Sequence, residues 1–356
     1  MDIALKYKNK NSLHNNLNFS KPNFKFIKIV RENNYCGLND IFEVFASIQR
    51  KDIYLASSNP NYNLDIISIK DIENCKVITS LKGHLYYINF IKYFKKEEKE
   101  EYLISADKDR VIIIWDIIND FSKYYKIETY SSIGEISCAL ICFNFIDSNK
   151  NIENYIIFSF NRENYTNIHS LYKKKKIREI KYTNTYNTNY LVFWENKNTL
   201  FELSEGKIFM YNREFILDKV LISDSYELNF NFGFIYNDKN ENDCFIFSSS
   251  SGNIYYYNLV KDKLISVISI NNNPIKDKNC LCYFIQWSNR YVIACDYYQK
   301  GFKVIDLETS SVIDSISNQH KGGVICAKKI YHPNKGECLL TAGNDEKIIL
   351  WNSLSG

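Results

Sequence analysis

The sequence predicts an all-β protein built from repeated units of short strands, and three observations support this fold class. From about residue 24 onward the chain is a succession of β-branched and aromatic runs of about four to eight residues, each followed by turn formers. Aromatic residues make up 15% of the 356 residues, which favours strands over helices. No stretch of helical length has an apolar face, and the nearest, the fully charged segment Lys95–Glu101, is predicted to be a solvated loop.

Two distant segments carry the same residue types at the same spacing. In each, a His is followed by a Ser or Thr at an offset of 21 residues, by an Asp at 25 and by a Trp at 31. Three matching offsets with chemically equivalent side chains indicate an internal repeat. The two sets are His84, Ser105, Asp109 and Trp115, and His320, Thr341, Asp345 and Trp351.

Both segments resemble the WD repeat, since each starts with a dipeptide ending in His and ends on Trp followed by Asp116 or Asn352. The resemblance implies a β-propeller whose blades are four-stranded antiparallel sheets. It also implies that the Trp donates to the Ser or Thr hydroxyl, the hydroxyl bonds to the His, and the His bonds to the Asp. Such a chain satisfies buried polar groups that would each cost about 1–3 kcal/mol if left unpaired. A Ser-His-Asp set also suggests a hydrolase, but its repetition and its Trp favour a structural role.

The spacing of the two sets predicts seven blades, with six or eight as alternatives. Five steps from one set to the other give about 47 residues per unit, slightly above the usual WD period. The last blade lacks a fourth strand, and the run 24–30 has no place in the first blade. We therefore expect residues 24–30 to close the last blade, which removes the open sheet edge. Residues 1–23 are predicted to be a flexible polar arm, and residues 24–356 a single propeller.

The intermediate blades lack the complete set. Where Trp would stand, blades 4, 5 and 6 have Tyr211, Tyr257 and Ile305, and blade 3 has no clear equivalent. We expect these blades to depend on apolar packing between neighbouring sheets. Trp194 and Trp287, each at the end of a first strand, are interpreted as packing residues.

Composition excludes several function classes. The 45 basic and 41 acidic residues give a net charge of only +4, and no two of the seven arginines are adjacent, so no clear nucleic-acid face is indicated. No apolar run approaches the ~20 residues of a membrane span, and no signal peptide is visible. The ten cysteines are irregularly spaced, and the pairs Cys138/Cys142 and Cys280/Cys282 are interpreted as reduced core thiols. A soluble protein in the cytoplasm or nucleus is expected.

The sequence offers no positive signal for catalysis. Two of the five histidines belong to the matched sets, and His14, His169 and His332 stand alone. Neither a zinc-protease motif, a phosphate-binding glycine loop nor a nucleophile elbow is present. No metal, cofactor or small-molecule substrate is therefore expected, and a propeller enzyme would need acidic or metal-binding residues at the axis.

The leading hypothesis is a non-catalytic scaffold that binds other proteins within a larger complex. The resemblance implies that partners bind the face formed by the turns between second and third strands and by the connections between blades. Tyr and Arg are common interface hot spots. The candidate residues on that face are Tyr86, Lys108, Arg110, Arg162, Tyr165, Tyr297, Tyr298, Lys300 and Asn344.

The alternative hypothesis is recruitment to a membrane or to RNA. It depends on the basic run Lys173–Arg178, which is predicted to lie between the third and fourth strands of blade 3, on the opposite side of the ring. The arginine pair of phosphoinositide-binding propellers is missing.

Overall fold

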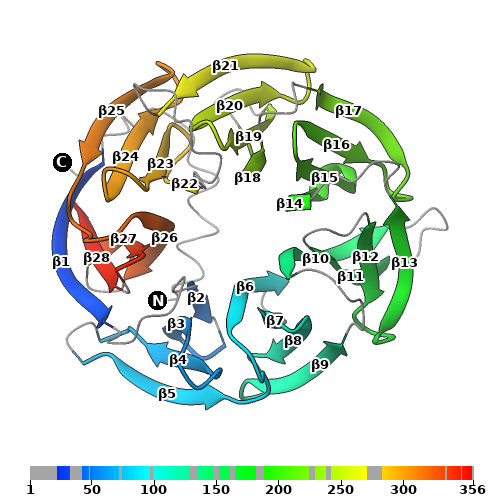
Figure 1. Ribbon diagram of the computed structural model, residues 1–356, viewed down its shortest axis with the longest axis horizontal. Helices are drawn as coiled ribbons and strands as arrows, with labels where there is room; N and C mark the ends of the chain where they lie inside the picture. Colours follow the sequence, from blue (N-terminus) through cyan, green and yellow to red (C-terminus); the bar gives the residue numbers. More distant parts are fainter. Residues whose placement is uncertain are drawn as a thin grey trace.

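The computed structural model describes residues 22–32, 42–47, 49–71, 74–96, 99–128, 135–146, 152–160, 165–181, 188–223, 229–237, 242–270, 283–332, 335–345 and 347–354. Within them, seven four-stranded antiparallel sheets form a closed ring (Figure 1). The predicted seven-bladed β-propeller is therefore confirmed. Most of the predicted arm, residues 1–21, lies outside the described residues.

The first strand of each blade lies nearest the axis and the fourth lies on the circumference (Figure 1). Blade 1 contains β2 (Phe42–Ser47), β3 (Asp52–Ser58), β4 (Leu64–Ser68) and β5 (Lys76–Leu81). Blade 2 contains β6 (Ile88–Lys96), β7 (Glu100–Asp107), β8 (Val111–Asp116) and β9 (Ser122–Glu128). Blade 3 contains β10 (Ile136–Ile146), β11 (Ile152–Phe160), β12 (Tyr165–Ser170) and β13 (Lys175–Lys181).

The second half of the ring repeats this order. Blade 4 contains β14 (Thr188–Trp194), a 3-10 turn η1 (Glu195–Lys197), β15 (Thr199–Ser204), β16 (Lys207–Tyr211) and β17 (Leu217–Ser223). Blade 5 contains β18 (Phe230–Asn237), β19 (Asp243–Ser249), β20 (Asn253–Asn258) and β21 (Lys263–Ser269). Blade 6 contains β22 (Phe284–Gln286), β23 (Tyr291–Asp296), β24 (Gly301–Asp306) and β25 (Ser311–Ile316).

Blade 7 combines the two ends of the propeller. Its strands are β26 (Val324–His332), β27 (Gly336–Gly343) and β28 (Lys347–Leu354), and β1 (Asn23–Glu32) pairs antiparallel with β28 as the outermost strand. The closure also buries aromatic surface, since the Phe24 ring centroid lies 4.9 Å from that of Trp287 and 5.2 Å from that of Phe302. The N-terminal strand therefore ties blade 7 to blade 6 as well as completing its sheet.

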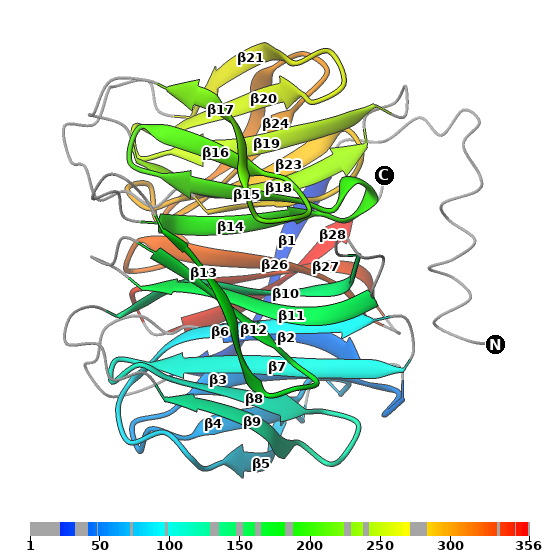
Figure 2. The same cartoon turned by 90° about the vertical axis from the view of Figure 1, so that its right-hand side faces the viewer.

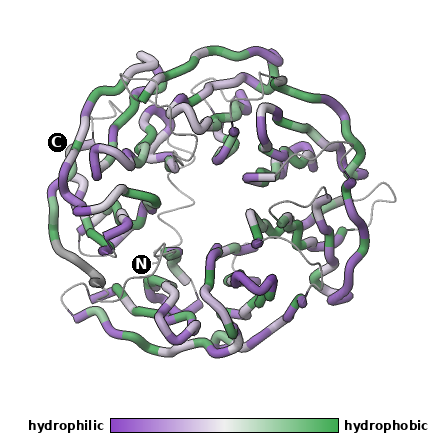
Figure 3. Tube along the Cα trace, in the orientation of Figure 1, coloured by the Kyte–Doolittle hydropathy of each residue, from purple (hydrophilic) through white to green (hydrophobic). Residues whose placement is uncertain are grey.

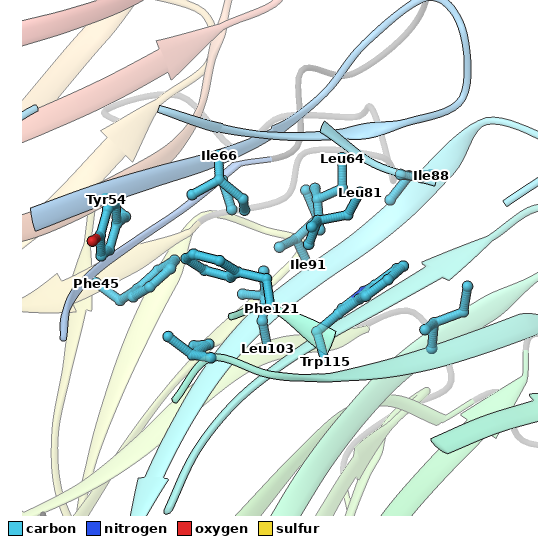
Figure 4. Close-up of a cluster of buried hydrophobic side chains, with 13 residues drawn as sticks. Phe45, Tyr54, Leu64, Ile66, Leu81, Ile88, Ile91, Leu103, Trp115 and Phe121 are labelled. Carbon is cyan, nitrogen blue, oxygen red and sulfur yellow. The ribbon is translucent and has the colours of Figure 1, made fainter. Parts of the chain in front are cut away.

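Apolar side chains fill the space between neighbouring blades. Figure 4 shows the cluster between blades 1 and 2, where Tyr54 and Leu64 of one sheet face Leu103 and Trp115 of the other. Burying one such side chain stabilises the fold by about 1.5–3 kcal/mol. Seen from the side, inner strands such as β10 and β14 run close to the direction of the ring axis, whereas the outer strands β13 and β17 cross this direction steeply (Figure 2). Neighbouring sheets pack face to face. In Figure 3, hydrophobic segments alternate with hydrophilic ones along the strands.

The interpretation of Lys95–Glu101 as a solvated loop is wrong. β6 runs to Lys96 and β7 starts at Glu100, so only three residues separate the two strands. Lys95 pairs across the ladder with Glu101, and Lys96 with Glu100. Cross-strand pairs of opposite charge stabilise a hairpin, and the alternating lysine and glutamate runs encode this pairing.

The strand register supplies the blade 3 residue that the sequence did not reveal. In blades 2, 4, 5 and 6 a β-bulge on the outer strand lies opposite Trp115, Tyr211, Tyr257 and Ile305. The same bulge in blade 3 lies at His169, which pairs with Ile156 as Trp115 pairs with Leu103. His169 therefore occupies the Trp position of blade 3. Trp287 is buried and Trp194 stacks on Phe201, in keeping with packing roles.

Candidate functional site

The set in blade 7 forms the predicted chain of hydrogen bonds. The Nδ1 atom of His320 lies 2.9 Å from Oδ1 of Asp345, and its Nε2 atom lies 2.9 Å from Oγ1 of Thr341. Nε1 of Trp351 donates to the same hydroxyl at 2.9 Å. Because an ionised carboxylate only accepts, Nδ1 carries the proton and Nε2 accepts from the Thr341 hydroxyl.

The set in blade 2 uses a different carboxylate from the predicted one. Nε2 of His84 lies 2.6 Å from Oγ of Ser105, and Trp115 donates to Ser105 at 2.9 Å, as expected. However, Nδ1 of His84 lies 2.8 Å from Oδ2 of Asp107. The assignment of Asp109 is therefore wrong. Asp109 is exposed, and its backbone N–H donates to Asp107, whose carboxylate also fixes the turn.

A glycine explains the difference between the two sets. Asp107 and Gly343 occupy equivalent positions, each paired with the first residue of its inner strand. A Cβ atom at Gly343 would lie 2.6 Å from Nδ1 of His320 and 2.7 Å from Oδ1 of Asp345. The missing side chain leaves the space through which Asp345 reaches His320. Where that position carries a carboxylate, as in blade 2, the carboxylate bonds to the His directly.

Both sets are buried, so no substrate reaches their Ser, His and Asp groups. The His84 and Asp107 side chains are fully inaccessible, and His320 and Thr341 lie in the core. Burial favours the neutral acid at Asp345, but hydrogen bonds from His320 and from the Lys321 N–H outweigh it and hold its pKa below the usual range. These groups act as structural staples between the loops and the strands of their blades.

The turn between the second and third strands of one blade contacts the connection leading into the next blade. We call the side of the ring where these segments lie the loop face. The Tyr62 ring of blade 1 meets Tyr87 of blade 2 edge-on, with centroids 4.9 Å apart. Lys108 of blade 2 pairs with Glu135, which directly precedes β10 of blade 3, at 3.5 Å. The turns of blades 6 and 7 also contact each other, since Nδ2 of Asn344 donates to the Tyr297 hydroxyl at 3.0 Å.

The predicted binding residues separate into three groups in the structure. Tyr86, Lys108, Tyr297, Tyr298, Lys300 and Asn344 are exposed on the loop face. Tyr165 is half-buried, and Arg162 lies outside the described residues. Arg110 does not belong on this face, because it is only 7% exposed and its guanidinium lies over the Phe160 ring at 5.7 Å. Arg110 has a left-handed backbone conformation (φ 66°) at the end of the turn.

The loop face carries two exposed aromatic patches, and each lies beside a staple. The first, patch A, consists of Leu85, Tyr86 and Tyr87, which directly follow His84, together with Tyr62. The Tyr87 carbonyl also accepts from the Lys108 N–H at 3.0 Å. Leu85 is 75% exposed. Sequence reasoning selected only Tyr86 here, although three consecutive apolar residues after the His are a visible signal for an exposed patch.

The second patch, patch B, consists of Tyr297 and Tyr298 with Asn344, the residue before Asp345. The two tyrosine rings meet edge-on with centroids 5.7 Å apart. Asp296 closes the turn beneath them by accepting from the Gln299 N–H at 2.9 Å and by pairing with Lys303 at 3.0 Å. Both patches are thus held by ordered turns.

The axis of the ring carries a mixed aromatic and ionic cluster. Lys92 of blade 2 donates to the Tyr190 hydroxyl of blade 4 at 3.0 Å, and Lys328 of blade 7 pairs with Glu43 of blade 1 at 2.8 Å. Lys92 and Lys328 share one offset from the His of their sets, a repeat that sequence reasoning missed. Glu43 is the carboxylate that pairs with a lysine here, and in the described part of the chain no three His, Cys, Asp or Glu residues gather closely enough to hold a metal.

The basic run and the cysteines, which are the remaining candidates, contact other side chains of the propeller. The basic run lies in the β12–β13 turn and β13, opposite the loop face, with Lys173 paired to Glu153 at 3.1 Å and Lys174 over the Tyr124 ring at 4.2 Å. Cys138 and Cys142 are buried in the blade 3–blade 4 core, and burial raises the pKa of the Cys138 thiol to about 12. Cys280, Cys282 and His14 lie outside the described residues.

The fold and these surfaces define the class, a seven-bladed β-propeller with buried polar staples in two blades. No model of a known protein family matches the chain, and comparison with curated proteins finds no similar sequence. Among the described residues, no helix has the length and apolar character needed to cross a membrane.

Proposed function

We propose that the chain is a WD-repeat protein that binds other proteins through patches A and B of its loop face and has no catalytic activity of its own. The observation that carries the proposal is the position of these exposed aromatic patches beside the two buried staples. Tyrosine supplies a large contact area with few rotatable bonds and a polar tip for hydrogen bonding.

Rigid presentation strengthens such a surface. Binding costs free energy wherever a mobile loop becomes ordered, and this cost falls when the loop is already fixed. His84 is fixed by Ser105 and Asp107, directly before Leu85. Asn344, which donates to Tyr297, directly precedes Asp345 of the second staple. The polar groups that resemble a hydrolase triad therefore support a recognition surface.

The WD assignment is supported by the hydrogen-bonded sets of blades 2 and 7 and by the seven-bladed ring. The buried thiols of Cys138 and Cys142 fit a reducing compartment inside the cell.

The test is affinity purification of the full chain from its native cells, compared with Tyr86→Ala/Tyr87→Ala and Tyr297→Ala/Tyr298→Ala. Each pair removes two exposed anchors, so we expect capture of the same partners to fall by at least about 30-fold, the loss typical of one hot spot. Val77→Ala/Ile78→Ala, which removes two exposed hydrophobic side chains from the outer strand of blade 1, is the matched control. Equal recovery of every partner by both double variants at an unchanged Tm would refute the proposal.

A further inference from the structure

The structure points to a second surface, and we infer that it docks the propeller onto a bilayer containing anionic lipids. This surface, the rim patch, consists of residues 172–181, 212–223 and 259–269, which are the outer strands of blades 3, 4 and 5 with the turns that precede them. It lies on the circumference and away from the loop face, so the inference is independent of the proposed partner binding.

The rim patch is continuous across the three blades. The guanidinium of Arg178 in β13 donates to the backbone carbonyl of Glu214 in the turn of blade 4. Lys219 in β17 pairs with Asp262 in the turn of blade 5. Figure 1 shows β13, β17 and β21 following one another along the circumference, and in Figure 2 β13 and β17 face the viewer.

Aliphatic side chains are concentrated on this part of the rim. Of nineteen exposed large hydrophobic residues in the described part of the chain, seven lie in blades 4 and 5 of the rim patch. β21 carries no charge after its first residue. An uncharged aliphatic edge strand left in water promotes aggregation, so a covering surface is expected. The seven residues are Ile216, Leu217, Val220, Val260, Leu264, Ile265 and Val267.

The charge of the rim patch complements an anionic surface. Its three segments contain ten Lys and Arg and four Asp and Glu, a net charge of +6, whereas the whole chain carries +4. Four of these cations, Arg213, Lys219, Lys261 and Lys263, lie in the same two segments as the seven aliphatic residues. Lys175, Lys261 and Lys263 form no ion pair with another described residue. Lysines beside exposed aliphatic groups suit a bilayer, where the chains enter the interface and the ammonium groups meet anionic headgroups.

The residue types favour a bilayer over other acidic partners. Single-stranded RNA is held by stacking on aromatic rings or guanidinium planes, and of the nine exposed large hydrophobic residues described in the rim patch only Tyr172 is aromatic. Protein interfaces are enriched in Tyr, Trp and Arg and depleted in Lys, and their hot spots seldom include Leu or Val. The loop face exposes tyrosines, as protein interfaces do, whereas the rim patch exposes mainly Lys, Ile, Leu and Val.

The experiment is flotation of the full chain with vesicles of phosphatidylcholine, with and without phosphatidylserine. We expect binding only when phosphatidylserine is present, and weaker binding at high salt. Lys175→Gln/Lys261→Gln/Lys263→Gln should weaken it by about 100-fold, since each lysine near an anionic membrane contributes about a factor of five. Ile216→Ser/Leu217→Ser/Ile265→Ser should weaken it by about tenfold or more.

Val77→Ser/Ile78→Ser is the matched control, because these two exposed aliphatic residues lie on the outer strand of blade 1, outside the rim patch. It should bind vesicles as the unaltered chain does, as should Tyr297→Ala/Tyr298→Ala. Circular dichroism melting verifies that each variant folds. The inference fails if the unaltered chain does not float with phosphatidylserine vesicles, or if the aliphatic variant binds them unchanged. Binding of single-stranded RNA that survives the aliphatic variant but not the lysine variant assigns the surface to RNA instead.

Discussion

Blades 2 and 7 differ from blades 3, 4 and 5 in what fills the same position of the sheet. In the stapled blades, a small hydroxyl residue, Ser105 or Thr341, accepts a hydrogen bond from Trp. In blades 3 and 5, the equivalent residues are Phe158 and Phe247, both fully buried. The sheets have the same order and the same outer bulge in either case. The strand register, and not the polar staple, therefore defines a blade.

Blade 4 shows an intermediate solution. Glu202 stands at the hydroxyl position, where it accepts from the Thr188 hydroxyl and lies beside the Tyr211 hydroxyl. Burial and then the nearby Glu202 carboxylate raise the pKa of Tyr211, so its hydroxyl keeps the proton with which it donates. A polar chain has thus been rebuilt from other residue types. Satisfying the buried groups matters more than which groups they are.

The largest effect is expected from truncating the phenylalanine that occupies, in blades 3 and 5, the position of Ser105 and Thr341. Phe158→Ala should lower the free energy of unfolding by about 4 kcal/mol, because a buried ring is lost and a cavity remains. Thr341→Val in blade 7 replaces the hydroxyl by a methyl group of similar size and should cost about 1–3 kcal/mol. Denaturant titration of both variants measures the difference. If Thr341→Val costs more than Phe158→Ala, the polar staples contribute more to the stability of the ring than the apolar packing does.

The next effect concerns pH. Burial, and then the charge of Lys176, lowers the pKa of His169 to about 4, against 6.5 in the unfolded chain. Between these values the unfolded state holds the extra proton, so acid favours unfolding. The resulting loss in the free energy of unfolding amounts to about 3 kcal/mol once the pH is below 4, and it is absent above about pH 7. His169→Gln should reduce this acid sensitivity of Tm, and an unchanged pH profile would show that His169 titrates normally in the fold.

A smaller effect distinguishes the two aspartates of blade 2. Asp107→Ala should cost about 2 kcal/mol, since it leaves His84 and the turn N–H groups without their acceptor. Asp109→Ala, which removes an exposed side chain, should change stability by less than about 0.5 kcal/mol. Chemical denaturation of the two single variants decides between them. The reverse order of effects would restore the spacing-based assignment.

The smallest effect is expected from placing the carboxylate of blade 7 at the position that it has in blade 2. The turns after Asp107 and Gly343 have the same length, since Ala106 pairs with Ile112 and Ala342 with Ile348. Asp345→Ala should lower Tm, and Gly343→Asp/Asp345→Ala should recover part of that loss through the new carboxylate. Full recovery is not expected, because the added Cβ atom lies 2.6 Å from Nδ1 of His320 and the ring has to shift, which leaves a net change of about 1 kcal/mol. No recovery would mean that the two turns differ in more than their carboxylate.

Much of the fold follows from local patterns. Strand runs, turn residues and the offsets between His320 and Trp351 are local in the sequence, and the all-β class, the seven blades and the closing strand were predictable from them. The bonds of the second set were expected from the resemblance to the WD repeat. The offsets failed at Asp109 because two carboxylates lie within three residues of each other on the same turn. Spacing alone does not say which of the two reaches the His.

Only the tertiary structure decided which surfaces the propeller offers. The burial of Arg110 depends on Phe160 of the next blade, and patch A depends on Tyr62 of the previous one. The rim patch joins β13, β17 and β21, which the sequence presents as three separate short runs. The chain by itself determines blades 1 to 6, because each of them is a contiguous stretch whose strands pair with their sequence neighbours, and only blade 7 takes a strand, β1, from the other end of the propeller. The sequence does not reveal the surfaces, because each surface is formed by side chains of different blades. Whether such a side chain is buried or exposed depends on its neighbours from the adjacent blade.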